Sequence, residues 1–195
     1  MEKTIKTHSF YLFLSFFLLS SCFNSEISTE TEQKKIKNDV LANELKTDRN
    51  GLSSSLSVIK TVHGNITFKY YPKSAPNTVT RVIKLVTTGF YDGLSFHRVI
   101  PNFIIQTGDP TGTGKGGSGN KLKSEFNSLQ HIRGTLAMAR SMSDMDSADS
   151  QFYISLGTLP QLDEKYTVFG QVIDGIEVLD KISQGDKIIS VEYIE

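Results

Sequence analysis

The stretch 96–109, FHRVIPNFIIQTGD, decides the fold of this chain, because two strand patterns meet there across a turn. Its first five residues alternate in the manner of a strand, a Pro-Asn pair marks a turn, and a second apolar run follows. These features predict two short strands joined by a tight connection. In that arrangement Arg98, Phe103 and Gln106 share one surface.

The arginine in this stretch has two possible roles. A guanidinium is always charged and carries five donors in a rigid fork, so a phenyl ring beside it indicates a site that combines a hydrogen bond with an apolar pocket. The alternative is a surface arginine on an edge strand, since exposed arginines are common and binding sites are few. The local pattern around Arg98 leaves both readings open.

The composition is that of one ordinary globular domain. The chain has 195 residues, of which 38% are hydrophobic and 22% are charged, so it can build a core and is not biased toward disorder. Lys plus Arg equal Asp plus Glu at 21 each. This balance argues against a nucleic-acid partner and against a generally basic membrane face.

Residues 1–21 are interpreted as a targeting segment. Two lysines precede the apolar run 10–19, which is too short to span a bilayer and suits a secretory signal. The adjoining Leu19-Ser20-Ser21-Cys22 resembles the bacterial lipobox, in which the signal is cut before a cysteine that is then lipidated. We therefore expect a lipid anchor at Cys22 that holds the domain on a membrane of the bacterial cell envelope, outside the cytoplasm. The alternative is an ordinary cleavable signal.

A polar segment follows the expected anchor. Residues 22–55 are rich in Ser, Thr, Glu, Lys and Asn, which predicts a tether to a folded domain over 56–195. A weak apolar spacing between Ile36 and Leu45 could form a short helix, although an isolated helix of this length is marginal in water. Because Cys22 is the single cysteine, no intramolecular disulfide can form.

The domain 56–195 is predicted to be mainly β. Strand patterns flank a His-Gly-Asn turn, and the next segment has helical spacing with Asn77 as its N-cap and Gly89 as its stop. The elements expected outside the opening stretch are strands at 56–62, 66–71, 134–139, 151–156, 167–173 and 188–194, and helices at 77–88 and 176–183. Without βαβ alternation, these elements favour a closed eight-stranded antiparallel barrel capped by two α-helices.

Several motifs that suggest cofactors lack their usual context. Residues 112–117 match G-x-G-x-x-G, but no helix pattern follows, which argues for a structural loop and against dinucleotide binding. Asp144, Asp146 and Asp149 lack the glycine and the spaced glutamate of an EF-hand loop. The four histidines are scattered, and no serine or thiol is placed as a nucleophile. We therefore expect neither a metal nor an organic cofactor.

Six short motifs occur in a fixed order within the domain. They are FYDG at 90–93, FHRVIPNF at 96–103, QTGD at 106–109, GTLAMA at 134–139, SQFYI at 150–154 and TVFGQV at 167–172. With these motifs the domain resembles the cyclophilin-type peptidyl-prolyl isomerases. The resemblance implies an eight-stranded barrel capped by two helices, no cofactor, and proline-containing polypeptides as substrate.

The resemblance also implies roles for particular residues, with Arg98 as the catalytic arginine. The implied substrate-binding residues are Phe103, Ile104, Tyr153 and Leu162 in the proline pocket, and Gln106, Ala139, Arg140, Gln151 and Tyr166 along the groove. Tyr153 stands where many members have phenylalanine, and its hydroxyl needs a partner. Gln161 and Tyr166 stand where eukaryotic cytosolic members carry tryptophan and histidine. The change at Gln161 argues against strong cyclosporin binding.

The implied activity is the acceleration of X-Pro bond rotation in envelope proteins during their folding. Rotation breaks amide resonance and needs no proton transfer, which suits a site without a nucleophile or base. The alternative is a non-catalytic module on the membrane surface that binds proline-containing segments or acts as a chaperone. Isomerase activity on a short X-Pro peptide would separate the two hypotheses. We expect the protein to be a monomer.

Overall fold

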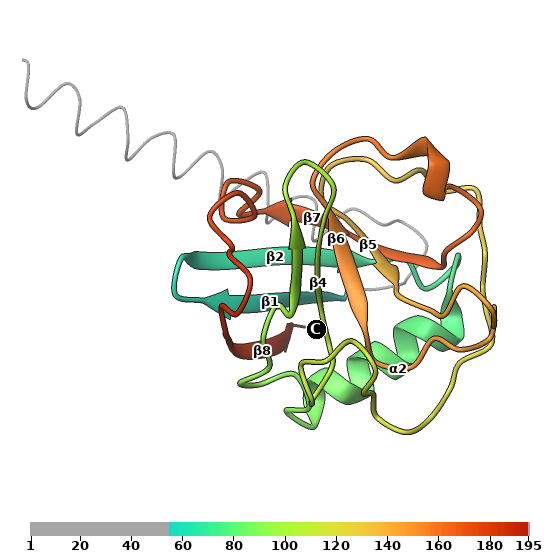
Figure 1. Cartoon of the computed structure of the whole chain (residues 1–195), viewed down its shortest axis with the longest axis horizontal. Coiled ribbons are helices and arrows are strands. Elements are labelled where there is room, and N and C mark those ends of the chain that lie inside the picture. The colour runs from blue at the N-terminus through green and yellow to red at the C-terminus, as the bar shows by residue number, and fades with distance from the viewer. Residues whose placement is uncertain (1–54, 195) are drawn as a thin grey trace, which may run out of the picture. The chain divides into compact units, whose positions relative to one another are not determined.

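The computed structural model describes residues 55–194, in which eight strands form one antiparallel sheet (Figure 1). The strands are β1 (Leu56–Thr61), β2 (Gly64–Tyr70), β3 (Arg98–Ile100), β4 (Ile104–Thr107), β5 (Thr135–Met138), β6 (Phe152–Ser155), β7 (Val168–Asp174) and β8 (Ile188–Ile194). Their order across the sheet is β3-β4-β6-β5-β7-β2-β1-β8. The prediction of a mainly β domain with eight antiparallel strands is confirmed. The expected signal, the lipid-anchor residue Cys22 and almost all of the tether lie outside the described residues.

The sheet curls, so that the segments before its two end strands, β3 and β8, meet. An antiparallel bridge pairs Ser95 with Lys187, and the amide of Ile188 donates to the carbonyl oxygen of Leu94 at 2.8 Å. Within residues 55–194 no ladder extends this contact along β3 and β8 themselves. The sheet is therefore a curled half-barrel joined by a bridge, and the expected closed barrel is not seen as a continuous ladder.

The predicted first helix is present as α2 (Pro76–Thr87), which packs beside β8 (Figure 1). Its apolar stripe, which includes Val79, Val82 and Val86, is buried against the sheet. Since an amphipathic helix gains most of its stability from such packing, the 3.6-residue spacing was a reliable signal. No helix among the described residues has the length and apolar character needed to cross a membrane.

The N-terminus of α2 is capped differently from the prediction. The N-cap is Ala75, not Asn77, and it makes no side-chain cap hydrogen bond. Instead, the carboxylate of Glu125 accepts hydrogen bonds from the amides of Asn77 and Thr78 at 3.0 and 2.8 Å. Burial acts to raise the pKa of Glu125, but these hydrogen bonds outweigh it and lower the pKa below its ordinary value. An acidic residue 47 positions away in sequence thus satisfies the free amides of the helix.

The predicted second helix at 176–183 is wrong. This segment consists of successive turns, in which the amides of Val178 and Lys181 donate to carbonyls three residues earlier. Val178, Leu179 and Ile182 are nevertheless buried in the core. Their spacing produced the helical prediction, but in the structure these three residues are buried from a segment of turns. A short 3-10 helix, η1 (Pro160–Leu162), was not predicted.

The buried apolar residues form two clusters on opposite faces of the central strands β4, β5 and β6. The inner cluster fills the curl of the sheet under α2 and includes Ile105, Leu136 and Ile154. The outer cluster contains the alternate residues of the same strands, Ile104, Ala137 and Tyr153, together with Leu159 and Val168. Because successive side chains of a strand point to opposite faces, one set of strands builds both the core and a second apolar surface.

Candidate active site

The candidate site begins at the strand pair that opens the sequence analysis. Arg98 on β3 pairs with Gln106 on β4, and Gln106 pairs in turn with Tyr153 on β6. The turn between β3 and β4 places Asn102 at φ 59°, a left-handed conformation that asparagine tolerates better than most residues. Arg98 is exposed, while Gln106 is half-buried beside it. The predicted connection therefore puts the guanidinium at the edge of the outer cluster.

A chain of three hydrogen bonds holds the arginine in place. Arg98 Nη1 donates to Gln106 Oε1 at 3.1 Å, and Gln106 Nε2 donates to Gln151 Oε1 at 2.9 Å. Gln151 Nε2 then donates to the carbonyl oxygen of Gly116 at 2.8 Å. Each amide is used both as donor and as acceptor, so the orientation of each group is fixed by its neighbours. Among the residues that the structure describes, no other partner engages the guanidinium, so its remaining N–H groups can bind a ligand.

The glycine-rich loop 110–119 anchors the far end of this chain. Asp109 accepts hydrogen bonds from the amides of Thr111 and Gly114 at 2.7 and 2.6 Å. Burial acts to raise the pKa of Asp109, but the bonds from the loop dominate and lower it to about 2. At Gly116 a side chain would collide with the carboxylate of Asp109, which explains the glycine at this position. The G-x-G-x-x-G match is therefore part of a loop folded around a carboxylate.

A second carboxylate, that of Asp149, holds the end of the same loop. It accepts hydrogen bonds from the amides of Ser118, Gly119 and Asn120 at 3.0, 2.8 and 3.1 Å. The sequence did not predict this role for Asp109 or Asp149. Their partners are backbone amides, which every residue carries, so only the folded loop shows which amides they bind. Together the two carboxylates fix the position of the Gly116 carbonyl that Gln151 contacts.

His97 lies next to Arg98 in sequence and contributes no charge to the site at neutral pH. Burial lowers the pKa of His97, although the nearby carboxylate of Asp109 acts in the opposite direction. No hydrogen bond of normal geometry reaches either ring nitrogen among the described residues. The positive charge at this edge of the site therefore belongs to Arg98.

The outer cluster provides an apolar surface beside the arginine. Phe103, Leu162, Tyr166 and Ala139 are half-buried and pack against the buried Ile104 and Tyr153. The rings of Tyr153 and Tyr166 meet edge to face with their centroids 5.7 Å apart. A partly open apolar surface beside a fixed donor can bind a small apolar group and place a hydrogen bond against it.

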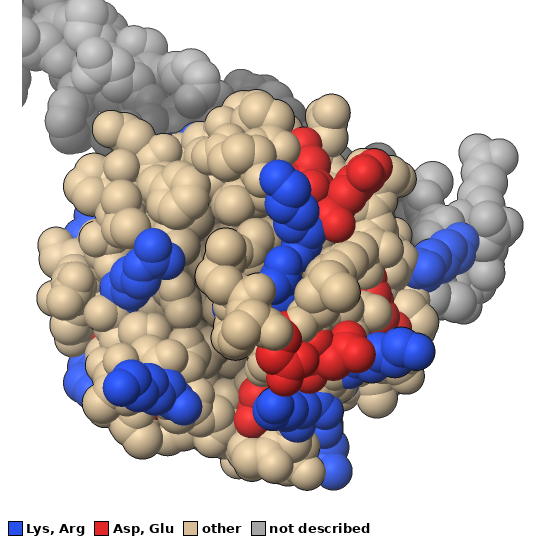
Figure 2. All heavy atoms as spheres, turned by 45° about the vertical axis from the view of Figure 1, so that its right-hand side comes forward, with Lys and Arg blue, Asp and Glu red and all other residues tan. Residues whose placement is uncertain are grey.

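The residues at one end of this surface hold Arg140 rigidly. Its guanidinium lies over the ring of Tyr166, 4.8 Å from the centroid, and 5.6 Å from the centroid of Phe126. Arg140 Nε and Nη1 donate to the carbonyl oxygens of Lys165 and Ser141. Arg140 therefore supports Tyr166 by stacking. On the face shown in Figure 2, basic side chains on the left are surrounded by uncharged surface, whereas those on the right lie beside acidic side chains.

Comparison with known proteins identifies the family. A model of the family "cyclophilin type peptidyl-prolyl cis-trans isomerase/CLD" matches residues 56–192. The chain belongs to this family. The peptidyl-prolyl cis-trans isomerase of Helicobacter pylori strain 26695 is 44% identical over 144 residues, which cover 72% of this chain and 87% of that protein. The isomerase of Synechococcus elongatus is 42% identical over 140 residues, covering 71% and 95% of the two chains.

Solved cyclophilin structures show the same fold. A cyclophilin-type isomerase from Cryptosporidium parvum matches with a TM-score of 0.67 and 32% identity, covering 73% of this chain and 98% of that one. The same protein in the presence of the dipeptide Ala-Pro matches with a TM-score of 0.64 and 33% identity, covering 71% and 97%. This chain is therefore a cyclophilin in sequence and in fold.

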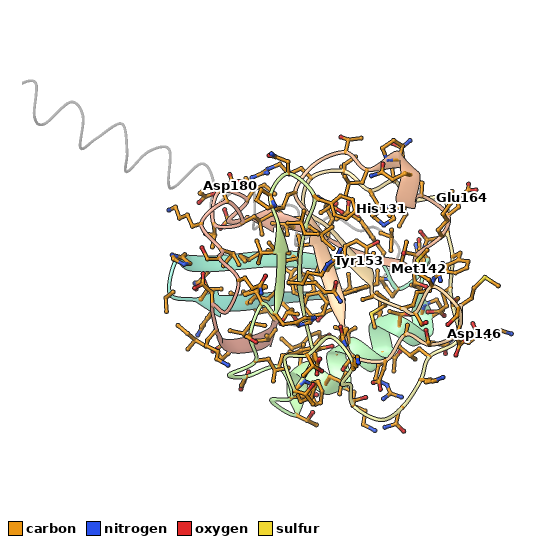
Figure 3. The ribbon with its side chains drawn as sticks, viewed as in Figure 1. His131, Met142, Asp146, Tyr153, Glu164 and Asp180 are labelled. Atoms are coloured by element: carbon orange, nitrogen blue, oxygen red, sulfur yellow. The ribbon has the colours of Figure 1, made fainter. Side chains whose placement is uncertain are left out.

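The structure brings the predicted site residues together in two groups. Arg98, Gln106 and Gln151 form the hydrogen-bonded chain, whereas the predicted pocket residues belong to the outer cluster. Gln161, which the resemblance aligns with a tryptophan of eukaryotic cytosolic members, is exposed on η1. Two residues that were not predicted support Tyr153: His131 is hydrogen-bonded to the Tyr153 hydroxyl (both labelled in Figure 3), and Asp163 is hydrogen-bonded to His131. The unusual tyrosine was the one signal in the sequence that a polar partner must exist.

Proposed function

We propose that the outer site isomerises X-Pro bonds in polypeptides, with Arg98 as the catalytic residue. The observation that carries the proposal is the guanidinium fixed by Gln106 at the edge of an apolar surface. The proline ring would lie on the surface formed by Phe103, Ile104 and Tyr153. Gln106 and Gln151 would orient Arg98, and Leu162, Tyr166, Ala139 and Arg140 would border the groove.

Such a site can act on the rotation directly. The barrier to rotation of a peptide bond is about 18–20 kcal/mol, because rotation breaks amide resonance. In the planar ground state the proline nitrogen shares its lone pair and is a poor acceptor. In the twisted transition state the lone pair is localised, so it can accept a hydrogen bond from Arg98. The interaction is stronger in the transition state than in the ground state, which is the condition for catalysis.

The required acceleration is within reach of this arrangement. Shortening an uncatalysed isomerisation of tens of seconds to milliseconds needs roughly a 10⁴-fold increase, or about 5–6 kcal/mol. An oriented charged donor supplies about 2.7–4 kcal/mol at sites of developing charge. Exclusion of water from the apolar surface and restriction of the bound peptide would provide the remainder.

The test is the substitution Arg98→Ala. We expect kcat/KM on an X-Pro peptide to fall by about 10² to 10³, with peptide binding weakened only modestly. The fold should remain intact, because the guanidinium is exposed. Arg98→Lys should recover part of the activity, since an ammonium cannot reproduce the planar fork.

Lys84→Ala, which removes an exposed positive charge on α2, serves as the control and should retain full activity. A folded Arg98→Ala protein with parental kcat/KM would refute the mechanism. If neither the parent nor the variant isomerises the peptide, the non-catalytic binding module replaces the enzyme.

We propose further that the isomerase acts as a monomer at the bacterial cell envelope, anchored by a lipid on Cys22. The support is the apolar run 10–19 followed by a lipobox-like segment and the polar tether 22–55. Its clients would be proline-containing envelope proteins during folding. Cys22→Ser should move the protein from the membrane fraction to the soluble fraction or leave an uncleaved precursor. Membrane retention of a mature-sized Cys22→Ser chain would rule out the lipid anchor.

A further inference from the structure

The hydroxyl of Tyr153 is hydrogen-bonded behind the outer cluster by a side chain that is fully buried. His131 Nε2 lies 2.9 Å from the Tyr153 hydroxyl oxygen (both residues are labelled in Figure 3). His131 Nδ1 lies 2.8 Å from Asp163 Oδ1. The side chain of His131 is 0% exposed. The three residues therefore form one chain of hydrogen bonds that runs from the loop after η1, through the interior, to the middle of β6.

The direction of each hydrogen bond follows from Asp163. Hydrogen bonds from the backbone amide and the ring of His131 lower the pKa of Asp163, so it is a carboxylate that can only accept. His131 Nδ1 must therefore carry a proton. In the neutral imidazole Nε2 is then the acceptor, and the Tyr153 hydroxyl must be the donor. Burial raises the pKa of Tyr153, so its proton is retained.

The rings around this chain are locked by contact as well. His131 stacks on Tyr153 with the centroids 5.9 Å apart and meets Tyr166 edge to face at 6.5 Å. The backbone carbonyl of His131 accepts a hydrogen bond from Leu159, which precedes η1. His131 thus joins β6, which carries Tyr153, to the segment that carries Leu162. A shift of His131 would move two walls of the pocket at once.

We propose that His131 and Asp163 are positioning residues that hold the Tyr153 hydroxyl away from the proline pocket. The pocket then presents only the ring of Tyr153 to the substrate, as a phenylalanine would, and the ring is fixed by a hydrogen bond that phenylalanine cannot make. The inference rests on the proposed function, because it assumes that Tyr153 lines the proline pocket. It deepens that function because it makes the affinity for X-Pro segments depend on the buried hydrogen bonds that join Asp163, His131 and Tyr153.

A double-mutant cycle in the full chain tests the proposal. Tyr153→Phe leaves the buried Nε2 of His131 without its donor, and His131→Phe leaves the hydroxyl without its acceptor. Each single variant should raise KM for an X-Pro peptide by about threefold to tenfold and leave kcat within about twofold, because a buried polar group without a partner is costly. The double variant removes both polar groups, so its KM should return to within about twofold of the parent.

Tyr70→Phe is the matched control for the loss of a buried tyrosine hydroxyl. The Tyr70 hydroxyl is bonded to Ser57 Oγ at 2.7 Å, and its ring belongs to the inner cluster. This variant should lower the stability and leave KM unchanged. If the single variants at Tyr153 and His131 behave like Tyr70→Phe, the chain is merely structural and the proposal is wrong.

A spectroscopic measurement tests the same chain without any variant. In nitrogen NMR of the parent, we expect the neutral ring of His131 to show a protonated Nδ1 and an unprotonated, hydrogen-bonded Nε2. A protonated Nε2 in the neutral ring would overturn the assignment of the Tyr153 hydroxyl as donor. If the parent neither binds nor isomerises the peptide, both the proposed function and this inference are wrong. If the parent is active but the effects of Tyr153→Phe and His131→Phe on KM are simply additive, only this inference is wrong.

Discussion

The two faces of strand β4 differ in the surroundings that they give to their side chains. Ile105 faces the inner cluster and is 0% exposed, while its neighbour Ile104 faces the outer cluster and is 3% exposed. The two isoleucines have the same volume and nearly the same burial. The inner one is enclosed by the curled sheet and α2, whereas the outer one is surrounded by half-buried residues that a ligand can contact. Burial alone therefore does not distinguish a core position from a site position.

The polar atoms on the two faces are satisfied in different proportions by backbone and side-chain partners: the inner cluster has one tyrosine hydroxyl of each kind, at Tyr91 and Tyr70, whereas the outer site relies on side chains. On the inner face the Tyr91 hydroxyl donates to the backbone carbonyl of Ser150, so its partner is set by the fold alone. On the outer face Gln106 and Tyr153 are bonded to the side chains of Gln151 and His131. A backbone partner survives most substitutions, but a side-chain partner does not. The outer face therefore depends on residue identity as well as on apolar volume.

The largest expected effect comes from shortening the two isoleucines in turn. Ile105→Ala should lower the free energy of unfolding by about 3–5 kcal/mol, because the enclosed inner cluster cannot collapse around the cavity. Ile104→Ala should cost only about 2 kcal/mol, since the more open outer cluster can relax, and should raise KM for an X-Pro peptide several-fold. Urea unfolding and peptide kinetics of both variants provide the measurement. If Ile105→Ala and Ile104→Ala lose the same stability and have the same KM, the two faces do not differ in the way we propose.

The same contrast explains how much the sequence predicted. The period-2 alternation around Arg98 was sufficient to place it beside Gln106, because register within a tight strand pair is a local property. The family motifs then selected the outer-cluster residues. In contrast, the partners of Tyr153 and Gln151 come from distant segments, and only tertiary packing brings them together.

Failures elsewhere have the same origin. The apolar spacing at 176–183 was correct about burial and wrong about conformation, because Val178, Leu179 and Ile182 can pack equally well from consecutive turns. Helix formation in so short a segment depends on its surroundings rather than on its own propensity. The role of Glu125 as the cap of α2 was likewise invisible, since the sequence offered Asn77 as a local candidate.

The next effect is the dependence of stability on pH that arises from Asp109, the carboxylate that holds the loop behind the outer site. The pKa of Asp109 is about 2 in the folded protein against an ordinary value of 3.8, so the folded state favours the carboxylate. Its contribution of about 2 kcal/mol is therefore present above pH 4 and is lost as pH falls from about 4 to about 2. Asp109→Asn should remove this stabilisation at neutral pH and flatten the dependence of stability on pH within that window.

Denaturant unfolding of the parent and the variant between pH 2 and 6 is the measurement, and Ile105→Ala is the control. A cavity on the inner face lowers stability equally between pH 2 and 6, because the titratable residues of the inner cluster are tyrosines whose pKa values are raised by burial. If the stability of Asp109→Asn falls with acid as steeply as that of the parent, the Asp109 carboxylate is not the source of the pH dependence. The proposed difference in polar groups between the two faces would then lack this support.

The smallest effect concerns Gln151, the middle residue of the hydrogen-bond chain that orients Arg98, the proposed catalytic residue. Gln151→Leu keeps the volume but removes both the acceptor for Gln106 and the donor to Gly116, so Arg98 loses its indirect support. We expect kcat/KM to fall by about tenfold, or about 1.4 kcal/mol, well below the loss in Arg98→Ala. Gln171→Leu is the matched control, since Gln171 is also half-buried and bonded to Thr135 and Arg133, and it should leave kcat/KM unchanged. In an Arg98→Ala background the further loss from Gln151→Leu should vanish, because there is no guanidinium left to orient. A full tenfold loss in that background would mean that Gln151 contacts the substrate itself. The assignment of Arg98 as the donor, with Gln106 and Gln151 only orienting it, would then be wrong.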